Sequence, residues 1–317
     1  YDESAELQEQ ELNENPRLRF KLLNSAYTDK NEIWAPFVEE LKGFSEERYE
    51  ALKPIILEKD IPSLQASVKA GALTYEDLVL FYLYRIRKYE SDNSLALNAI
   101  IALNPDVVEQ ARQKDREGAQ AEAEFSLYGM PILLKDNINT HNMPTTAGAI
   151  ALAENTTGNA FIVERLLEAG ALILGKVNLS EWAYYFCDGC PLGYSAVGGQ
   201  TLNPYGRKIF ESGGSSSGSA VAVAANYAVA AVGTETAGSI LSPSSKNAVV
   251  GLKPTIGLLS RTGIVPISST LDTPGPITRS VIDNAIFLQA MTGKDPADKA
   301  SVSTAANYLN AVQDPSM

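Results

Sequence analysis

The stretch that decides the fold is AVAVAANYAVAAVGTETAGSI, residues 220–240, in which small apolar residues run into threonine, glycine and serine. Its first thirteen residues are interrupted by Asn226 and are fewer than the roughly 20 that cross a bilayer. We therefore predict a buried core helix over residues 219–231 and no membrane span. Ser239 follows in a Gly-Ser step, where it is a candidate nucleophile that needs a base to take its proton.

Strand-like and helix-like stretches alternate along the rest of the chain. Thr74 and Ser280 each precede a carboxylate by three residues, which is a helix N-cap signal. Apolar runs and helical periodicity predict strands at 97–103, 131–136 and 171–176, and helices at 75–89, 105–118, 160–170, 178–185 and 281–291. This alternation predicts an α/β fold with helices packed on a mixed sheet.

Composition divides the chain into three regions. Residues 1–60, rich in Glu, Gln and Asn at their start, predict a helical N-terminal extension, and residues 61–295 predict the core. Residues 296–317 predict a polar tail with a short helix. Within the core, residues 201–219 consist largely of Asn, Pro, Gly and Ser, which is typical of a long surface loop.

The bulk composition is that of a globular protein with a large core, because 45% of the residues are hydrophobic and 20% are charged. A net charge of −12, with scattered Lys and Arg, leaves no basic surface for phosphates, so we expect no nucleic-acid partner. The chain begins at Tyr1 and not at Met, which favours an exported or periplasmic location, with the cytoplasm as the alternative.

The sequence contains only one histidine, His141, and this excludes several catalytic mechanisms. No cluster of metal ligands and no Gly-Lys-Ser/Thr phosphate loop is present in the sequence, so we expect neither metal nor cofactor. Residues 214–218, GSSSG, match a nucleophile elbow, but that fold requires a histidine after the serine. Cys187 and Cys190 form a lone C-x-x-C pair, for which two reduced thiols or a local disulfide fit better than zinc or thioredoxin-like chemistry.

A lysine can replace histidine as the base when burial or nearby positive charge lowers its pKa by several units. Lys135 follows the apolar run Pro131–Leu134 at the end of a predicted buried strand. It is therefore the candidate base, and the alternative is a strand-end lysine whose amine reaches solvent.

Five segments together resemble the amidase signature family, most of all its peptide amidase branch, between about Ser63 and Asp295. They are GMPILLKDNI (129–138), GGQTLNPY (198–205), GGSSSGSAVAVA (213–224), VGTETAGSI (232–240) and VVGLKPTIGLLSRTGIVPIS (249–268). The resemblance implies a central, mostly mixed sheet covered by helices on both faces. It also implies an amidohydrolase that cleaves carboxamides and releases ammonia from C-terminally amidated peptides, with water as co-substrate.

The resemblance further implies residue roles. Lys135 matches the family's base, Ser215 the serine beside a cis peptide bond, and Ser239 the nucleophile. Ser215 would relay the nucleophile's proton to Lys135. The resemblance also implies an oxyanion hole formed by the backbone N–H groups of Thr236, Ala237, Gly238 and Ser239. The supporting side chains that it implies are those of Thr234, Ser216 and Asp136.

Three features depart from the family pattern. Glu235 stands where many members have Asp, and Leu241 stands where many have an arginine. The missing arginine disfavours substrates with a carboxylate, and with them an amidotransferase subunit that works with partner chains and a tRNA. An amidase of fatty or small-molecule amides would also fit the sequence, as would an inactive scaffold. Family domains are also longer, so we expect the C-terminal part of the usual domain to be missing from these 317 residues.

Overall fold

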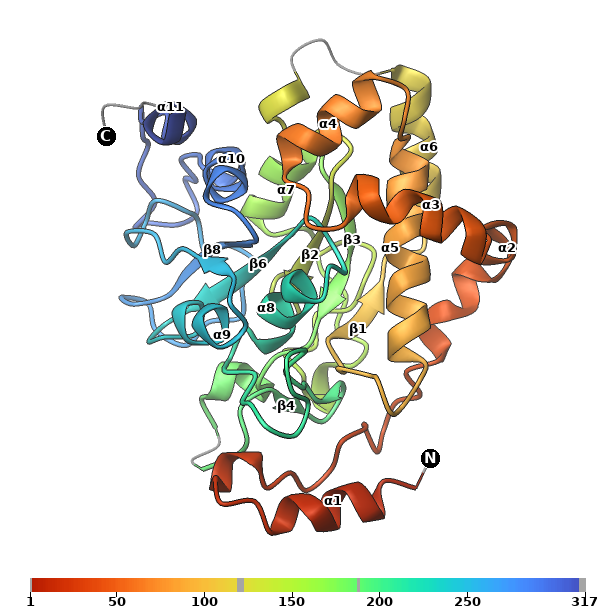
Figure 1. Ribbon diagram of the computed structural model, residues 1–317. Helices are drawn as coiled ribbons and strands as arrows, with labels where there is room; N and C mark the ends of the chain where they lie inside the picture. Colours follow the sequence, from red (N-terminus) through yellow and green to blue (C-terminus); the bar gives the residue numbers. More distant parts are fainter. Residues whose placement is uncertain (1, 119–122, 187–188, 314–317) are drawn as a thin grey trace.

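A six-stranded mixed β-sheet forms the centre of the computed structural model, which describes residues 2–118, 123–186 and 189–313 (Figure 1). β2 pairs in parallel with both of its neighbours, β3 and β6, and the remaining pairs in this sheet are antiparallel. Residues that follow β2 and β6 therefore meet at one edge of the sheet. In spatial order the strands are β1 (Ile100–Leu103), β3 (Leu172–Val177), β2 (Pro131–Lys135), β6 (Ala230–Glu235), β8 (Thr273–Thr278) and β7 (Val250–Gly251).

Helices flank this sheet (Figure 1), and the predicted α/β class is confirmed. α8 (Ser217–Ala224) packs against four strands, β2, β3, β6 and β8. α10 (Val281–Met291) packs against β8 and α7 (Phe161–Glu168), and α6 (Val107–Glu117) packs against β3. The remaining helices are α1 (Ser4–Glu11), α2 (Val38–Gly43), α3 (Glu46–Ile56), α4 (Ile61–Lys69), α5 (Tyr75–Glu90), α9 (Leu241–Lys246) and α11 (Tyr308–Gln313). Across the described ranges, none of these helices combines the length and the apolarity needed to span a membrane.

Every residue of β2, β3 and β6 is buried, because these strands lie inside the sheet and beneath helices. Strands of this kind read as continuous apolar runs, which is how β2 and β3 were predicted. Polar side chains break the apolar pattern only toward the carboxyl ends, where Lys135 and Lys176 are both fully buried. The sheet therefore carries buried ionisable groups next to its carboxyl edge.

The prediction of one helix over residues 219–231 was wrong in its extent. α8 begins at Ser217 and ends at Ala224, Asn226 takes a left-handed φ of 55°, and β6 has begun by Ala230. Asn tolerates this backbone region better than most residues, so it reverses the chain between helix and strand. A buried helix and a buried strand are equally apolar, so periodicity did not separate them.

The helix predicted at 178–185 was also wrong. The chain there makes a single 3-10 turn, Glu181–Tyr184, in which Trp182, Ala183 and Tyr184 all have positive φ. The turn is held by two longer-range contacts, from the Trp182 N–H to the Ala147 carbonyl and from the Ala196 N–H to the Glu181 carboxylate. Tertiary contacts have overridden the local helical pattern at this position.

Several predicted elements were confirmed with small shifts. α5 is capped by the Thr74 side chain, which accepts from the Asp77 N–H, and Ser280 caps α10 in the same way. The strand predicted at 97–103 is limited to β1, Ile100–Leu103. α6 begins two residues after Pro105, at Val107, because Asp106 occupies the N-cap.

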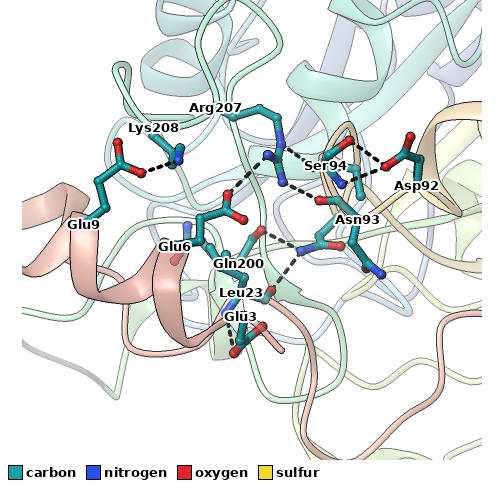
Figure 2. Close-up of polar contacts among 12 residues, drawn as sticks. Glu3, Glu6, Glu9, Leu23, Asp92, Asn93, Ser94, Gln200, Arg207 and Lys208 are labelled. Atoms are coloured by element: carbon teal, nitrogen blue, oxygen red, sulfur yellow. Dashed lines mark hydrogen bonds and ion pairs between the residues drawn. The ribbon is translucent and has the colours of Figure 1, made fainter. Parts of the chain in front are cut away.

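The N-terminal segment lies along the predicted loop 201–219 (Figure 2). Arg207 donates to the Glu6 carboxylate in α1 at 3.2 Å and to the carbonyls of Asn93 and Ala96 at 2.9 Å. Lys208 pairs with Glu9, the next acidic residue of α1, at 2.6 Å. These contacts hold one long loop of the core against the first helix of the chain.

The same loop is not a surface loop throughout. Residues 212–216 are buried, with Ser215 at the floor of a cavity described below, whereas Ile209 and Phe210 are exposed. The segment that enters α8 is thus part of the interior.

The predicted polar tail begins with residues that pack on the core. Arg261 forms a bidentate contact with Asp298, with the shorter distance 2.6 Å, and this ion pair lowers the pKa of Asp298. The short helix expected in this region is α11, Tyr308–Gln313.

Candidate active site

Lys135, the last residue of β2, carries the central amine of the site. Its side chain is fully buried, and its Nζ lies 2.7 Å from Ser215 Oγ. The same nitrogen lies 2.9 Å from Thr234 Oγ1 and 3.2 Å from the Thr234 carbonyl oxygen. The parallel pairing of β2 with β6 places these residues side by side, and Ser215 enters from the loop that precedes α8.

Burial lowers the pKa of Lys135 from its ordinary value of 10.5 to about 7, although Glu235 and Asp272 act in the opposite direction. Desolvation dominates because the amine has neutral oxygen partners and no carboxylate within ion-pair distance among the described residues. A lysine in this state is neutral in a large fraction of molecules near pH 7, so it can accept a proton.

The backbone around Ser215 is fixed by its local conformation and by a hydrogen bond. The Gly214–Ser215 peptide bond is cis, and the Ser215 carbonyl accepts from the Ser180 N–H at 3.1 Å. Gly213 has a φ of 67°, and a Cβ there would lie 2.7 Å from the Cα of Pro243. Only glycine fits that combination of conformation and space, so the approach to Ser215 depends on Gly213.

Ser216 connects the two serine-bearing loops. Its N–H donates to the Ser239 carbonyl at 3.1 Å, while its Oγ donates to the Thr234 carbonyl and accepts from the Thr234 N–H. Through these contacts Ser216 joins β6 to the turn that carries Ser239.

Ser239 lies in the turn between β6 and α9, half-buried, and shares a cavity of about 350 Å³ with Ser215. The turn is tied down by the Glu235 carboxylate, which accepts from the N–H groups of Ile240 at 2.7 Å and Leu241 at 2.9 Å. Gly238 contributes a φ of 89°, which permits the sharp bend.

Ala237 and Gly238 line the same cavity as Ser239. No group in the described part of the chain accepts a hydrogen bond from the amides of Ala237, Gly238 or Ser239. The neighbouring Thr236 donates from its hydroxyl to Asp272 at 2.5 Å. Asp272 in turn accepts from the N–H groups of Ile267 and Ser268, so one carboxylate joins the turn to a second loop. The amides of residues 237–239 are therefore available as donors to a group bound in the cavity.

Asp136 lies next to the base in sequence but turns away from Ser215. It forms a fully buried ion pair with Lys176 at 3.5 Å and accepts from the hydroxyl and the N–H of Thr146. Burial raises the pKa of Asp136 and lowers that of Lys176, and the pairing opposes both shifts. Asp136 and Lys176 together hold the 136–147 loop against β3.

Four residues of the site were not singled out by the sequence as contributors: Asn137, Lys176, Glu235 as a tether, and Asp272. Asn137 donates from Nδ2 to Thr234 Oγ1 at 3.0 Å, and its side chain is 2% exposed. The sequence could have indicated Asn137, because it is a polar residue directly after Lys135 and Asp136 at the end of a buried strand. Lys176 has a comparable signal, because it is charged within an otherwise apolar strand.

The wall of this cavity is largely apolar. Besides the two serines and their neighbours, the cavity is lined by Ala183, Tyr184, Tyr185, Leu192 and Ile267. Its lining, as far as the described residues go, contains no lysine, arginine or histidine. Leu241, the first residue of α9, follows Ser239 by two residues, is 49% exposed and carries no charge.

His141 takes no part in this site. Its N–H and its ring contact Asn159, and both residues line a different, smaller pocket. Of the predicted cysteine pair, Cys187 lies outside the described residues, and the Cys190 carbonyl accepts from the Tyr184 hydroxyl at 2.9 Å.

The known proteins that this chain resembles include amidases and an amidotransferase subunit. A probable amidase of Arabidopsis thaliana is 45% identical over 80% of this chain and 49% of its own length. A glutamyl-tRNA(Gln) amidotransferase subunit of Deinococcus deserti is 38% identical over 78% of this chain and 48% of its own length. The crystal structure of the peptide amidase from Stenotrophomonas maltophilia is 48% identical, with a TM-score of 0.75 over 80% of this chain and 53% of that one.

The chain spans about half the length of the relatives that it matches. All the residues of the site described above lie between positions 135 and 272, inside the region that the family comparison covers. The family model described as Amidase matches residues 77–315, which is most of the chain. This chain belongs to the amidase signature family.

Proposed function

We propose that this chain carries the active site of an amidohydrolase, in which Ser239 is the nucleophile, Ser215 the proton relay and Lys135 the base. The observation that carries the proposal is the buried Lys135 amine, 2.7 Å from the Oγ of Ser215, which itself lines the cavity that Ser239 shares. A fully buried lysine without a carboxylate partner is costly to keep charged, and general-base catalysis is the use that fits it.

Acylation begins when Ser239 Oγ attacks the carbonyl carbon of the amide. The Ser239 proton passes to Ser215, whose own proton passes to Lys135, so the lysine becomes an ammonium and the carbonyl oxygen an oxyanion. The amides of Ala237, Gly238 and Ser239 stabilise that oxyanion; removing one such donor typically costs about 3 kcal/mol in the barrier.

Collapse of the tetrahedral intermediate breaks the C–N bond. The relay returns the proton from Lys135 to the leaving nitrogen, which departs as ammonia when the substrate is a primary amide. Water then attacks the acyl-enzyme, the relay takes one of its protons, and Ser239 leaves with a proton restored. Each half-reaction starts and ends with neutral Lys135, so the cycle balances.

C-terminally amidated peptides are the substrate class we propose. The cavity wall is largely apolar, and Leu241 stands where many members of the family have an arginine that could hold a carboxylate next to the scissile bond. An amidated peptide has a neutral end, so it loses nothing from the missing cation. The 48% identity to a peptide amidase supports the same class.

Ammonia release from peptide amides, free amino-acid amides and fatty amides tests the proposal. We expect the highest kcat/KM on peptide amides, and no detectable turnover in Ser239→Ala or Lys135→Ala. His141→Ala is the control, because His141 is exposed and lines a different pocket, and it should retain wild-type rates. Undiminished activity of Ser239→Ala would remove the assignment.

A second function, within an amidotransferase complex, has one observation in its favour, the 38% identity to a glutamyl-tRNA(Gln) amidotransferase subunit. That function predicts ammonia release from glutamine that depends on partner chains. The chain alone, assayed with glutamine and with a peptide amide in parallel, separates the two functions: an amidohydrolase should hydrolyse the peptide amide unaided, whereas an amidotransferase subunit without its partner chains should release ammonia from neither.

A further inference from the structure

Lys135, the base of the proposed mechanism, needs hydrogen-bond partners besides Ser215. To take a proton from Ser215, the neutral Lys135 amine must point its one lone pair at Ser215 Oγ. Its two N–H bonds must then find acceptors elsewhere. The carbonyl of Thr234 can only accept, so it takes one of them at 3.2 Å.

The second acceptor is Thr234 Oγ1, 2.9 Å from Lys135 Nζ, and a hydroxyl is not bound to one role. If this hydroxyl donated to the lysine, it would occupy the lone pair that Ser215 needs. If it rotated about its own Cα–Cβ bond, one N–H of a buried amine would be left unpaired. The orientation of one threonine side chain therefore decides whether Lys135 faces the relay.

Asn137 is the group that holds this threonine. Its Nδ2 donates to Thr234 Oγ1 at 3.0 Å, from the turn directly after β2, and its own backbone carbonyl accepts from the Val265 N–H at 2.9 Å. With Asn137 and Lys135 as its two donors, the hydroxyl oxygen has both acceptor positions filled. Its proton is then left with the third direction, away from the lysine.

We propose that Asn137 is a positioning residue of the active site, which acts through Thr234 to hold the Lys135 amine with its lone pair facing Ser215. The inference rests on the proposed function, since it assigns a part in the same proton transfer. Asn137 contacts neither serine in the described structure, so its effect on the chemistry passes through Thr234.

A structural detail of Asn137 supports a role beyond packing. Its Oδ1 is buried and has no hydrogen-bond partner among the described residues. Asn137 itself lines a cavity of about 330 Å³, together with Thr234 and Asp272. A buried asparagine with only half of its amide satisfied is expensive as a purely structural choice. The part of the Asn137 amide that does have a partner is the Nδ2 group, which donates to Thr234.

A double-mutant cycle in the full chain tests this inference. Asn137→Leu removes the amide at similar size, and Thr234→Val removes the hydroxyl at similar shape. We expect each single variant to lower kcat on a peptide amide by roughly tenfold, the effect of one lost buried hydrogen bond, with KM changed less than about twofold. Because both changes break the same link, the double variant should lose no more than Thr234→Val alone.

Thr234→Ser is the rescue variant, because it keeps the hydroxyl within reach of Lys135, and it should stay within about threefold of wild type. Asn104→Leu is the matched control. Asn104 is 2% exposed and its amide also donates to a buried group, the Ile173 carbonyl, but it lines a different pocket. It should lower thermal stability and leave kcat unchanged. If Asn137→Leu fails to fold, Asn137→Ser takes its place in the cycle.

A second readout follows the lysine directly. When Thr234 Oγ1 is removed, the Lys135 ammonium loses one acceptor; when Asn137 no longer holds it, the hydroxyl can turn and donate to the neutral amine. Either change favours the neutral lysine, so its pKa should fall, while the charges that raise it, Glu235 and Asp272, stay in place. Titration of the ¹³C-labelled lysine ε-carbon by NMR, assigned with Lys135→Met, should show the same direction of shift in Asn137→Leu and Thr234→Val, and none in Asn104→Leu.

The outcomes separate the two claims. Losses that multiply in the double variant, a wild-type kcat in folded Asn137→Leu, or an unmoved Lys135 titration would each overturn the positioning role. If the wild-type chain hydrolyses no amide, the proposed function fails, and the NMR titration still decides whether Asn137 governs the lysine through Thr234.

Discussion

The Lys135 amine and the Ser215 hydroxyl lie 2.7 Å apart in the interior of the protein. They come from the end of a central strand and from the loop before α8, 80 residues apart in sequence. In water a lysine is charged at neutral pH and would be useless to a serine as a base. The burial of this pair is what turns two common side chains into an acid–base unit.

The first prediction concerns pH. Lys135 must be neutral to accept a proton, and its pKa is about 7, so kcat/KM should be low below about pH 6, rise through pH 7 and level off above about pH 8. A pH–rate profile on a peptide amide measures this. An acid limb near the ordinary lysine value of 10.5 would contradict the lowered pKa of Lys135, and a profile without any acid limb would contradict its role as the base.

Ser215 should be far more sensitive than a neighbouring buried serine. Ser215→Ala removes the relay between nucleophile and lysine, and we expect kcat to fall by at least about 10³, within the range of lost general-base catalysis. Ser219→Ala is the control, because Ser219 is equally buried on α8 but donates only to the Val232 carbonyl. Equal losses in both variants would mean that packing, and not proton transfer, is being measured.

Glu235 should act in two separable ways. Glu235→Gln keeps an acceptor for the Ile240 and Leu241 amides but removes the charge that raises the pKa of Lys135. We therefore expect the acid limb of the pH profile to move to lower pH, with the plateau rate reduced less than about tenfold. Glu235→Ala also unties the turn, and its plateau should fall by roughly 10² because the oxyanion donors lose their fixed positions. A pH limb that stays in place in Glu235→Gln would contradict the electrostatic part.

The parts of the fold that could be predicted from the sequence are those set by residues close together in the chain. Caps are local, so the helices that start after Thr74 and Ser280 were predicted almost to the residue. The helix over 219–231 was not, because a buried helix and a buried strand share the same apolar composition. The three positive φ angles at Trp182, Ala183 and Tyr184 have no local signature, since contacts from distant loops impose them.

The site followed the same rule. Lys135, Ser215 and Ser239 lie in segments whose order and spacing resemble a known family, so they could be named from the sequence. The contact of Thr234 with Asn137 and that of Thr236 with Asp272 could not be predicted, because they depend on which strands are neighbours and on how loops cross the sheet edge. The pairing of β2 with β6 is the fact that the sequence left open.

Leu241 is predicted to limit the choice of substrate. Leu241→Arg places a cation beside the cavity, so kcat/KM should rise by about tenfold for an amide that carries a free carboxylate next to the scissile group, relative to a neutral peptide amide. Leu241→Met is the uncharged control and should leave that ratio unchanged. The competition between the two amides in one assay gives the ratio directly, and a ratio equal in the Arg and Met variants would refute the role of this position.

The most direct test of the central claim is the site at which a serine-directed phosphonate labels the intact chain, mapped by peptide mass spectrometry. The account predicts one labelled residue, Ser239, at a rate that rises through pH 7 and is lost in Lys135→Ala and Ser215→Ala. Labelling at another serine, or labelling of Ser239 that proceeds at the wild-type rate without Lys135, would contradict it.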